Sequence, residues 1–149
     1  MRIFTFQSEL TLPRPRDEVF PFFADARNLQ ALTPPWLDFE ILSKGDVEMK
    51  AGAMIQYRIQ LHGIPVRWDT EITLWEPPER FVDEQRRGPY RLWRHEHAFL
   101  SQNGKTLVRD HVDYAVPGGR LVQKFFVEPD VEKIFDFRRR KLSEIFRLR

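Results

Sequence analysis

The chain alternates apolar and polar residues over much of its length, and a period of two is typical of half-buried β-strands. Residues 2–12 form the first such segment, and its main apolar positions share one side: Phe4, Phe6, Leu10 and Leu12. Breaks at proline, glycine and asparagine divide the later alternating region. They predict further strands at residues 36–42, 53–61, 64–75, 80–86, 91–100 and 106–116.

Three segments depart from this period and predict helices. Asp17 and Glu18 open a short helix over residues 18–24, because acidic side chains are favoured at a helix N-terminus. A second short helical segment, residues 26–32, stops before Pro34 and Pro35. The last thirty residues are predicted to form a long amphipathic helix, with one apolar face made of Val131, Ile134, Phe135, Leu142, Ile145 and Phe146.

Basic residues 138–141 of that helix fall largely on the opposite face. A run of this kind has the charge to touch acidic lipid or nucleic acid. A solvated face near a helix C-terminus, where cations are favoured, explains it more simply. We therefore expect Arg138 and its neighbours to face water.

Two tight turns set the register of two predicted hairpins. A two-residue turn at His62-Gly63 pairs Leu61 with Ile64 and, further along, Tyr57 with Trp68. Because side chains alternate between faces, this register collects one apolar face, Ile55, Tyr57, Ile59, Leu61, Ile64, Val66, Trp68, Thr70, Ile72 and Leu74. The opposite face is polar, which supports the register.

Asn103-Gly104 is the strongest hairpin signal of the chain. Pairing Gln102 with Lys105 places Trp93 opposite Tyr114, His95 opposite Val112, His97 opposite Asp110 and Phe99 opposite Val108. The other face then pairs Arg94 with Asp113 and Glu96 with His111, which are complementary charges. Three polar groups, His95, His97 and Asp110, therefore lie among apolar and aromatic residues.

Buried polar groups need partners, since an unpaired one costs about 1–3 kcal/mol. One interpretation is that Asp110 accepts a hydrogen bond from His97 and the pair joins two strands. The other is that the three groups line a cavity and contact the polar end of a ligand. A one-residue bulge at Gly104 is the competing register; it would place Arg109 and His111 opposite the histidines but turn Val108 and Val112 outward.

Composition narrows the classes of function. The 149 residues are the usual size of one domain, here 1–149, and 13% aromatic content suggests an interior rich in rings. A net charge of +2 gives little attraction to nucleic acid or to anionic membranes. The chain has no cysteine, no signal-peptide pattern and no run of membrane-spanning length, so we expect a soluble cytoplasmic protein.

Several motifs, in order along the chain, resemble the SRPBCC (START-like) superfamily, the polyketide cyclase/dehydrase and lipid-transport group that shares its fold with the birch pollen allergen. They are Leu32-Thr33-Pro34-Pro35-Trp36-Leu37, the segment Leu61–Trp68, the long stretch Phe81–Phe99, the segment Thr106–Tyr114, Pro117-Gly118-Gly119 and Ile134–Arg138. Within the superfamily, the chain is most similar to small bacterial ligand-binding proteins.

The resemblance implies an α+β helix-grip fold. Its order is one strand, two short helices, six consecutive antiparallel strands and a long C-terminal helix, with the curved sheet of about seven strands wrapped around that helix and a cavity inside. It also implies that Phe81, Asp83 and Gln85 share the inner face, which adds two polar groups near the histidines.

Two kinds of chemistry fit these residues. Neighbouring same-face residues lie about 6.5–7 Å apart on a strand, so His95 and His97, with Asp110 and Asp83, have the spacing for one metal ion. Hydrogen-bonded cavity histidines are the simpler interpretation, and we predict no metal and no cofactor. General acid–base catalysis is the second kind, with His97 and Asp110 as the pair and His95 as a further candidate.

The function that the sequence favours is non-catalytic binding or transport of a small hydrophobic or aromatic molecule, such as a lipid, an isoprenoid quinone or a polyketide-like compound. The alternative is a cyclase or dehydratase that uses the His97–Asp110 pair. A protein-interaction module acting through a sheet edge or the loop at residues 88–90 has no specific support. The predicted ligand-binding residues are Tyr57, Trp68, Thr70, Asp83, Gln85, Trp93, His95, His97, Phe99, Asp110, Val112 and Tyr114.

Overall fold

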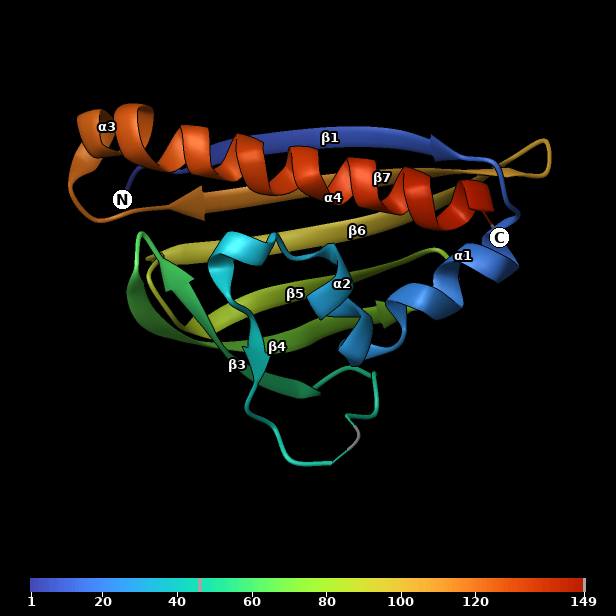
Figure 1. The fold of residues 1–149 in the computed structure, drawn as a ribbon, viewed down its shortest axis with the longest axis horizontal. Helices are drawn as coiled ribbons and strands as arrows, with labels where there is room; N and C mark the ends of the chain where they lie inside the picture. Colours follow the sequence, from blue (N-terminus) through green and yellow to red (C-terminus); the bar gives the residue numbers. More distant parts are fainter. Residues whose placement is uncertain (46, 149) are drawn as a thin grey trace.

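A curved antiparallel sheet with a long helix across it forms the body of the molecule (Figure 1). The computed structural model describes residues 1–45 and 47–148. Within them the sheet has seven strands in the order β1-β7-β6-β5-β4-β3-β2. Their bounds are β1 Phe4–Leu12, β2 Glu40–Ile41, β3 Met54–Leu61, β4 Ile64–Glu76, β5 Arg80–Arg87, β6 Leu92–Gln102 and β7 Lys105–Ala115.

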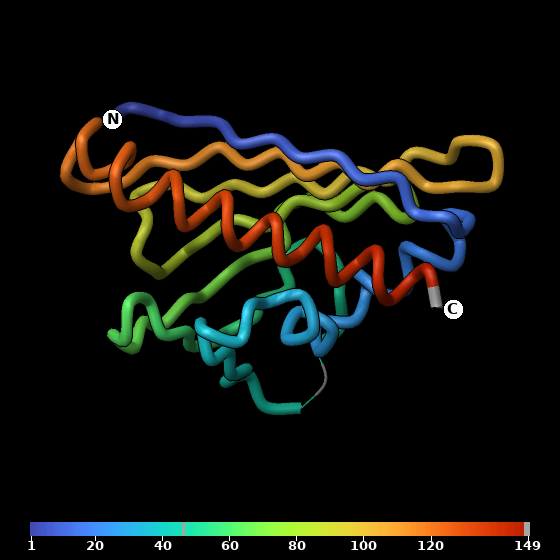
Figure 2. Tube along the Cα trace, turned by 45° about the horizontal axis from the view of Figure 1, so that its top comes forward, coloured from blue at the N-terminus to red at the C-terminus, as the bar shows by residue number. Residues whose placement is uncertain are grey.

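Helices close the concave side of the sheet. The long helix α4 packs along β1 and against α2, so the segment between β1 and β2 lies beside it (Figure 2). The helical elements are α1 Arg16–Phe23, η1 Ala26–Asn28, α2 Leu29–Leu32, η2 Pro35–Leu37, α3 Gly119–Val122, η3 Gln123–Val127 and α4 Glu128–Leu148. The predicted order of one strand, two short helices, six strands and a long helix is confirmed. None of the described helices has the length and apolarity needed to cross a membrane.

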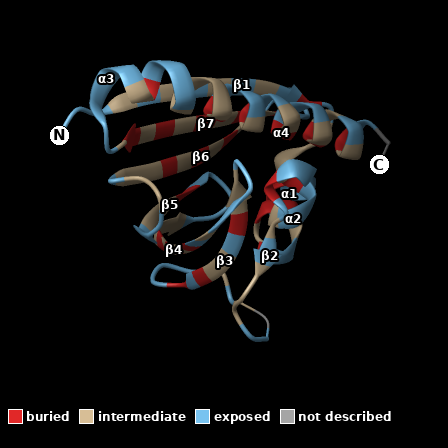
Figure 3. Cartoon of the chain, turned by 60° about the vertical axis from the view of Figure 1, so that its left-hand side comes forward, coloured by how far each residue is buried: buried red, intermediate tan, exposed pale blue. Residues whose placement is uncertain are grey.

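Both hairpins have the predicted register. Leu61 pairs with Ile64 in the first hairpin, and Gln102 pairs with Lys105 in the second. Asn103 and Gly104 have φ angles of 51° and 79°, the positive values that a type I′ turn requires. The bulged alternative at Gly104 is therefore wrong, and buried residues alternate along β6 and β7 as expected (Figure 3).

The predicted strand at 36–42 is mostly wrong. Only Glu40 and Ile41 pair with β3, whereas Pro35–Leu37 form a 3₁₀ turn. Proline has a fixed φ and no N–H to donate, so the chain at Pro35 favours the first turn of a helix over a strand. Asp38 then adopts a left-handed conformation, with φ 45°, which ends the turn.

A bulge in β4 corrects the predicted position of Leu74. The register of β4 against β5 shifts between Ile72 and Leu74, so that Trp75 lies opposite the inward-facing Phe81. Trp75 packs on the ring of Phe20, 5.4 Å between centroids, and takes the inner position that the uninterrupted period assigned to Leu74.

The apolar face of α4 is as predicted except at one position. Val131, Phe135, Leu142 and Phe146 are buried, but so is Arg138, which is 7% exposed. The prediction that Arg138 faces water is wrong. Position 138 lies three residues after Phe135 and four before Leu142, so the helical period itself places it in the buried stripe.

Candidate ligand-binding site

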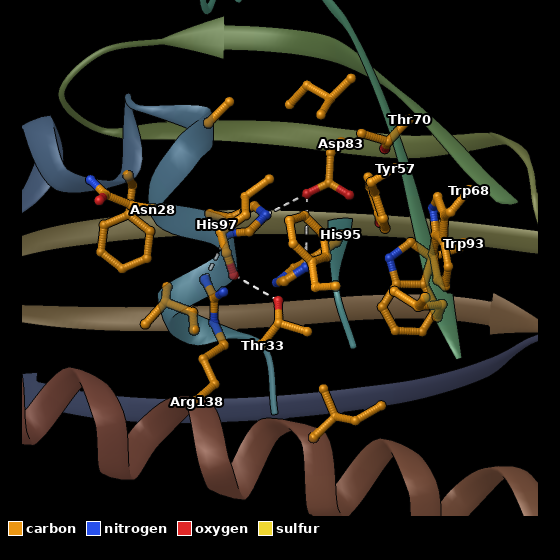
Figure 4. A pocket seen from close by; sticks show the side chains of 18 of the residues that line it. Asn28, Thr33, Tyr57, Trp68, Thr70, Asp83, Trp93, His95, His97 and Arg138 are labelled. Atoms are coloured by element: carbon orange, nitrogen blue, oxygen red, sulfur yellow. Dashed lines mark hydrogen bonds and ion pairs between the residues drawn. The ribbon is translucent and has the colours of Figure 1, made fainter. Parts of the chain in front are cut away.

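A cavity of about 160 Å³ lies between the inner face of β3–β6 and the helices α2 and α4. Most of its wall is apolar. Figure 4 shows polar side chains gathered on one side, Asp83, His95, His97 and Arg138, and aromatic ones, Tyr57, Trp68 and Trp93, on the other.

The aromatic wall is built by the first hairpin and β6. Tyr57 stacks on Trp68 with 5.8 Å between centroids and 17° between planes, because the two residues are cross-strand partners. Trp93 meets Trp68 edge-on, at 5.4 Å and 90°. Such contacts hold the rings in fixed orientations, so they form a rigid apolar surface.

The polar side is organised by a stack of rings. His95 and His97 project from the same face of β6, and their ring centroids are 3.6 Å apart. Phe81 stacks on the far side of His97 at 4.1 Å, and Phe135 of α4 meets His95 edge-on at 5.4 Å. Both imidazoles are therefore fixed, and only their nitrogen-bearing edges are available for polar contacts.

Each histidine has its own carboxylate, but the pairs differ from the prediction. His95 Nε2 lies 2.7 Å from Asp110 Oδ1, and His97 Nε2 lies 2.5 Å from Asp83 Oδ2. His97 Nδ1 is 3.7 Å from Asp110 Oδ1, beyond hydrogen-bond distance. The predicted His97–Asp110 hydrogen bond is wrong, because the Asp110 side chain leans diagonally to His95 instead of straight across to its Cα partner.

Arg138 joins the two pairs. Its Nη2 donates to His97 Nδ1 at 3.2 Å, and its Nε is 3.4 Å from Asp110 Oδ2. A guanidinium only donates, so His97 Nδ1 must be the acceptor and its proton sits on Nε2, where it faces Asp83. Both nitrogens of His97 are thereby used, and the ring is neutral.

Burial and charge agree with that assignment. Burial, with the adjacent His95, lowers the pKa of His97 to about 4, despite the opposing effect of Asp83. Burial raises the pKa of Asp110, but Arg138 and the hydrogen bond from His95 outweigh it and hold that pKa well below its usual value. Burial also raises the pKa of Asp83, but the hydrogen bond from His97 outweighs this effect, so the pKa of Asp83 is lowered.

The Tyr57 hydroxyl beside this cluster stays protonated. Burial, and then the charge of Asp83, raise the pKa of Tyr57 well above 10. Tyr57 therefore contributes a neutral hydroxyl to the wall and has no role as a base near neutral pH.

Two acceptor atoms of the cluster are left over. Among the described residues, His95 Nδ1 has no hydrogen-bond partner and lies 3.8 Å from Asp83 Oδ2. Asp83 Oδ1 likewise has no partner in residues 1–45 and 47–148. Both residues line the cavity, so their free acceptors are available to a ligand.

The histidines are poorly arranged for chelation. One nitrogen each of His95 and His97 and one oxygen of Asp83 lie within 4.8 Å of one another. Imidazole binds a metal in the plane of its ring, however, and two rings tilted by only 23° in a stack do not direct their lone pairs to a common point. A shared ion would require the stack to open and His97 to give up its bond to Asp83.

Of the predicted ligand-binding residues, seven line the cavity: Tyr57, Trp68, Thr70, Asp83, Trp93, His95 and His97. The others do not. Asp110 lies beneath His95, while Phe99 and Val112 pack in the core. The Tyr114 hydroxyl accepts a hydrogen bond from Gln123. The Gln85 amide is bound on both sides by the backbone of Tyr90, so it stabilises the β5–β6 loop.

Sequence reasoning missed the residues that the helices contribute. Arg138 is the most important of them, and the helical period was the signal that could have found it. Asn28 of η1 and the loop residues Thr33 and Tyr90 also reach the wall. Their positions depend on how the segment 24–37 folds back over the sheet, which no local pattern indicates.

Comparison with known proteins places this chain in a family. The sequence profile of the polyketide cyclase / dehydrase and lipid transport family matches residues 12–142. The chain belongs to this family. Among curated proteins, none matches the sequence significantly.

Solved structures support the family fold over nearly the whole chain. The Zhui aromatase/cyclase from a Streptomyces species superposes with a TM-score of 0.78 at 16% identity, covering 99% of this chain and 97% of that one. Norcoclaurine synthase from Thalictrum flavum gives 0.70 at 14% identity, with 97% and 86% covered. Ara h 8.0201 gives 0.69 at 14% identity, with 99% and 100% covered. Identities this low show a shared helix-grip fold and no more.

Proposed function

We propose that this member of the polyketide cyclase / dehydrase and lipid transport family binds a small ring-containing molecule inside the cavity. The observation that carries the proposal is the division of the cavity wall. Rigid aromatic side chains, Tyr57, Trp68 and Trp93, stand opposite a cluster with unfilled hydrogen-bond acceptors at Asp83 and His95. An apolar wall with a few convergent polar groups is the usual character of a small-molecule site.

The cavity volume limits the ligand. At about 160 Å³ it is close to the roughly 150 Å³ of an engineered apolar cavity that holds benzene. Sites for drug-sized molecules are larger, about 300–1,000 Å³. The volume therefore favours one or two rings over a long-chain lipid or the tail of an isoprenoid quinone.

Toluene is a direct probe of this proposal. At ten times its Kd, a ligand of the folded state adds about 1.4 kcal/mol of stability, which raises the Tm of a chain this size by about 3–6 °C. Ile59→Phe is the matched control, because Ile59 lines the cavity and a larger side chain there occupies the ligand's space. The variant should fold, show no response to toluene, and lose any compound that native mass spectrometry detects in the freshly purified wild type.

Two results would contradict the proposal. One is a wild-type protein whose Tm does not respond to toluene and that carries no bound compound. The other is an equal response in the wild type and in Ile59→Phe, which would place the toluene elsewhere.

An acid–base enzyme is the second candidate, and the geometry assigns it a different base from the one that the sequence suggested. His97 has no free nitrogen. His95 donates Nε2–H to the buried Asp110, which leaves Nδ1 as an acceptor beside the cavity. A carboxylate that fixes the tautomer of a histidine in this way is a recurrent arrangement for proton transfer.

Hydrogen exchange of acetophenone in D₂O tests this candidate. His95 Nδ1 would take a proton from the methyl group of acetophenone, and the electron pair of that C–H bond would pass to the carbonyl oxygen to form an enolate. The His95 imidazolium would exchange its proton with D₂O and return a deuteron to the carbon, which restores the ketone. His95→Gln should lower the protein-dependent exchange rate by roughly 10²–10⁴-fold. Equal exchange with and without the protein would remove this candidate and leave the binding proposal intact.

A further inference from the structure

The polar cluster presents two acceptors to the cavity and holds the histidine protons in internal bonds. The His97 and His95 Nε2 protons are given to Asp83 and Asp110. Arg138 Nη2 donates to His97, while Arg138 Nε lies 3.4 Å from Asp110 Oδ2 without a hydrogen-bond partner. Among the described residues, the second oxygen of Asp83 and Nδ1 of His95 remain as acceptors on the polar side of the cavity, and the Tyr57 hydroxyl is a donor in its aromatic wall.

The side chains of the polar cluster differ in solvent exposure. The Asp83 side chain is 18% exposed, against 4–9% for the side chains of His95, His97, Asp110 and Arg138. The carboxylate of Asp83 is thus the most accessible polar group of the cluster.

The charges of the cluster also favour a ligand that donates a hydrogen bond. Asp83 and Asp110 carry two negative charges and Arg138 one positive charge, while His97 is neutral. Asp83 is the most exposed of these charged groups, so its carboxylate would repel a ligand carboxylate and attract an O–H or N–H donor.

From this arrangement, and resting on the proposed function, we propose that the cavity selects aromatic molecules that carry a hydrogen-bond donor, a phenolic hydroxyl or an aromatic amine, and that Asp83 and His95 together accept it. Carboxylates are selected against, because the Asp83 carboxylate repels them. The Asp83 oxygen and His95 Nδ1 act as binding groups here, and no covalent step is involved.

Four matched ligands of one ring each test the selection by isothermal titration calorimetry of the full chain. They are p-cresol, which has a donor hydroxyl; p-xylene, with a methyl group in its place; 4-methylanisole, which only accepts; and p-toluate, which is a carboxylate. We expect p-cresol to bind at least about tenfold more tightly than the other three, as is typical of a hydrogen bond to a charged group.

Two substitutions test whether Asp83 and His95 cause the preference for p-cresol. Asp83→Asn removes the charge at nearly constant shape, and His95→Gln removes the imidazole acceptor; each should reduce the preference for p-cresol over p-xylene by several-fold or more. Asp25→Asn is the matched control. Asp25 also lines the cavity, but its oxygens already bind Arg27, so the variant should keep the full preference.

The outcomes separate this inference from the proposed function. Equal binding of p-cresol and p-xylene overturns the donor selection and leaves the cavity site standing. Tighter binding of p-toluate overturns it as well and points to Arg138 as the recognising group. Failure of all four ligands to bind contradicts both proposals. Since the four ligands decide the matter on the wild type, a variant that fails to fold does not remove the test.

Discussion

At the scale of single residues, the polar cluster is a set of buried ionisable groups whose protonation is fixed by their neighbours. His97 is the clearest case, because Arg138 and Asp83 occupy both of its nitrogens. This has a consequence for stability, since the unfolded chain releases His97 from both partners and lets it titrate normally.

We predict that the free energy of unfolding falls as the pH is lowered from 6.5 to 4. The pKa of His97 is about 4 in the folded protein and 6.5 without the fold, so in this window the unfolded state binds more protons. The stability present above pH 6.5 should drop by about 2–3 kcal/mol at pH 4.5. Asp83 and Asp110, whose pKa values are also lowered, add their own loss only below about pH 4.

Urea denaturation at pH 7.0 and 4.5 measures this, with His97→Gln as the comparison because glutamine both donates and accepts without titrating. The variant should show a difference between the two pH values that is smaller by about 2–3 kcal/mol. A pH dependence as steep as that of the wild type would mean that His97 is not the group responsible.

Arg138 gives a second prediction at this scale. Arg138→Met leaves Asp110 buried without its cation, and breaking a buried pair in this way costs about 3–5 kcal/mol. Arg140→Met is the control, since Arg140 is 69% exposed and its ion pair with Asp136 contributes at most about 1 kcal/mol. Chemical denaturation at pH 7 that gives equal losses for the two variants would contradict the role of Arg138.

The same residues show what the sequence could predict of the site. Alternation on one strand identified His95 and His97, and a hairpin register placed Asp110 beside them. The pairing of Asp110 with His95, and of Asp83 with His97, was not predictable. A register fixes Cα neighbours but not the direction in which a carboxylate side chain points. The burial of Arg138 was missed because its charge was weighed above its place in the helical period.

At the scale of elements, the turns carry most of the predictive information. A two-residue turn with positive φ at both positions leaves one pairing for every residue of its strands, so His62-Gly63 and Asn103-Gly104 fixed both hairpins. The bulge at Leu74 and the 3₁₀ turn at Pro35 were not predictable in the same way. A bulge leaves no composition signal, and prolines mark a break without saying what replaces the strand.

Gly104→Ala tests the turn. Gly104 has φ +79°, and a Cβ added there meets nothing within 4 Å, so any loss comes from backbone strain alone. We expect a loss of about 1–2 kcal/mol in urea denaturation, and a smaller one for Gly104→Asn, since asparagine tolerates the left-handed region. If alanine and asparagine are equally harmless, the turn is not of the type I′ form.

At the scale of the whole molecule, the cavity exists because sheet and helix do not meet along their full length. One end of α4 packs into an apolar core with α1 and the sheet, through Phe146 and Leu142. The other end packs on β7 through Val131 and Phe135. Between these two contacts the sheet curves away towards β3, and the short segment around α2 covers the opening (Figures 1 and 2).

This arrangement was predictable only in outline. The order of elements and the resemblance to a family indicated a helix gripped by a sheet with a cavity between them. The contribution of Asn28 and Thr33 to the cavity wall was not predictable, because it depends on contacts between segments far apart in the chain. For the same reason, the small volume that limits the ligand could be learned only from the structure.

The most direct test of a ligand site in this cavity uses the four tryptophans as reporters. Trp68 and Trp93 line the cavity, Trp75 lies in the neighbouring core and Trp36 is exposed. In an NMR titration of ¹⁵N-labelled protein with p-cresol, the indole signals of Trp68 and Trp93 should shift together and saturate with a single Kd, while that of Trp36 stays in place. Saturable shifts confined to Trp36, or none at Trp68 and Trp93, would contradict the proposal that the cavity is the binding site.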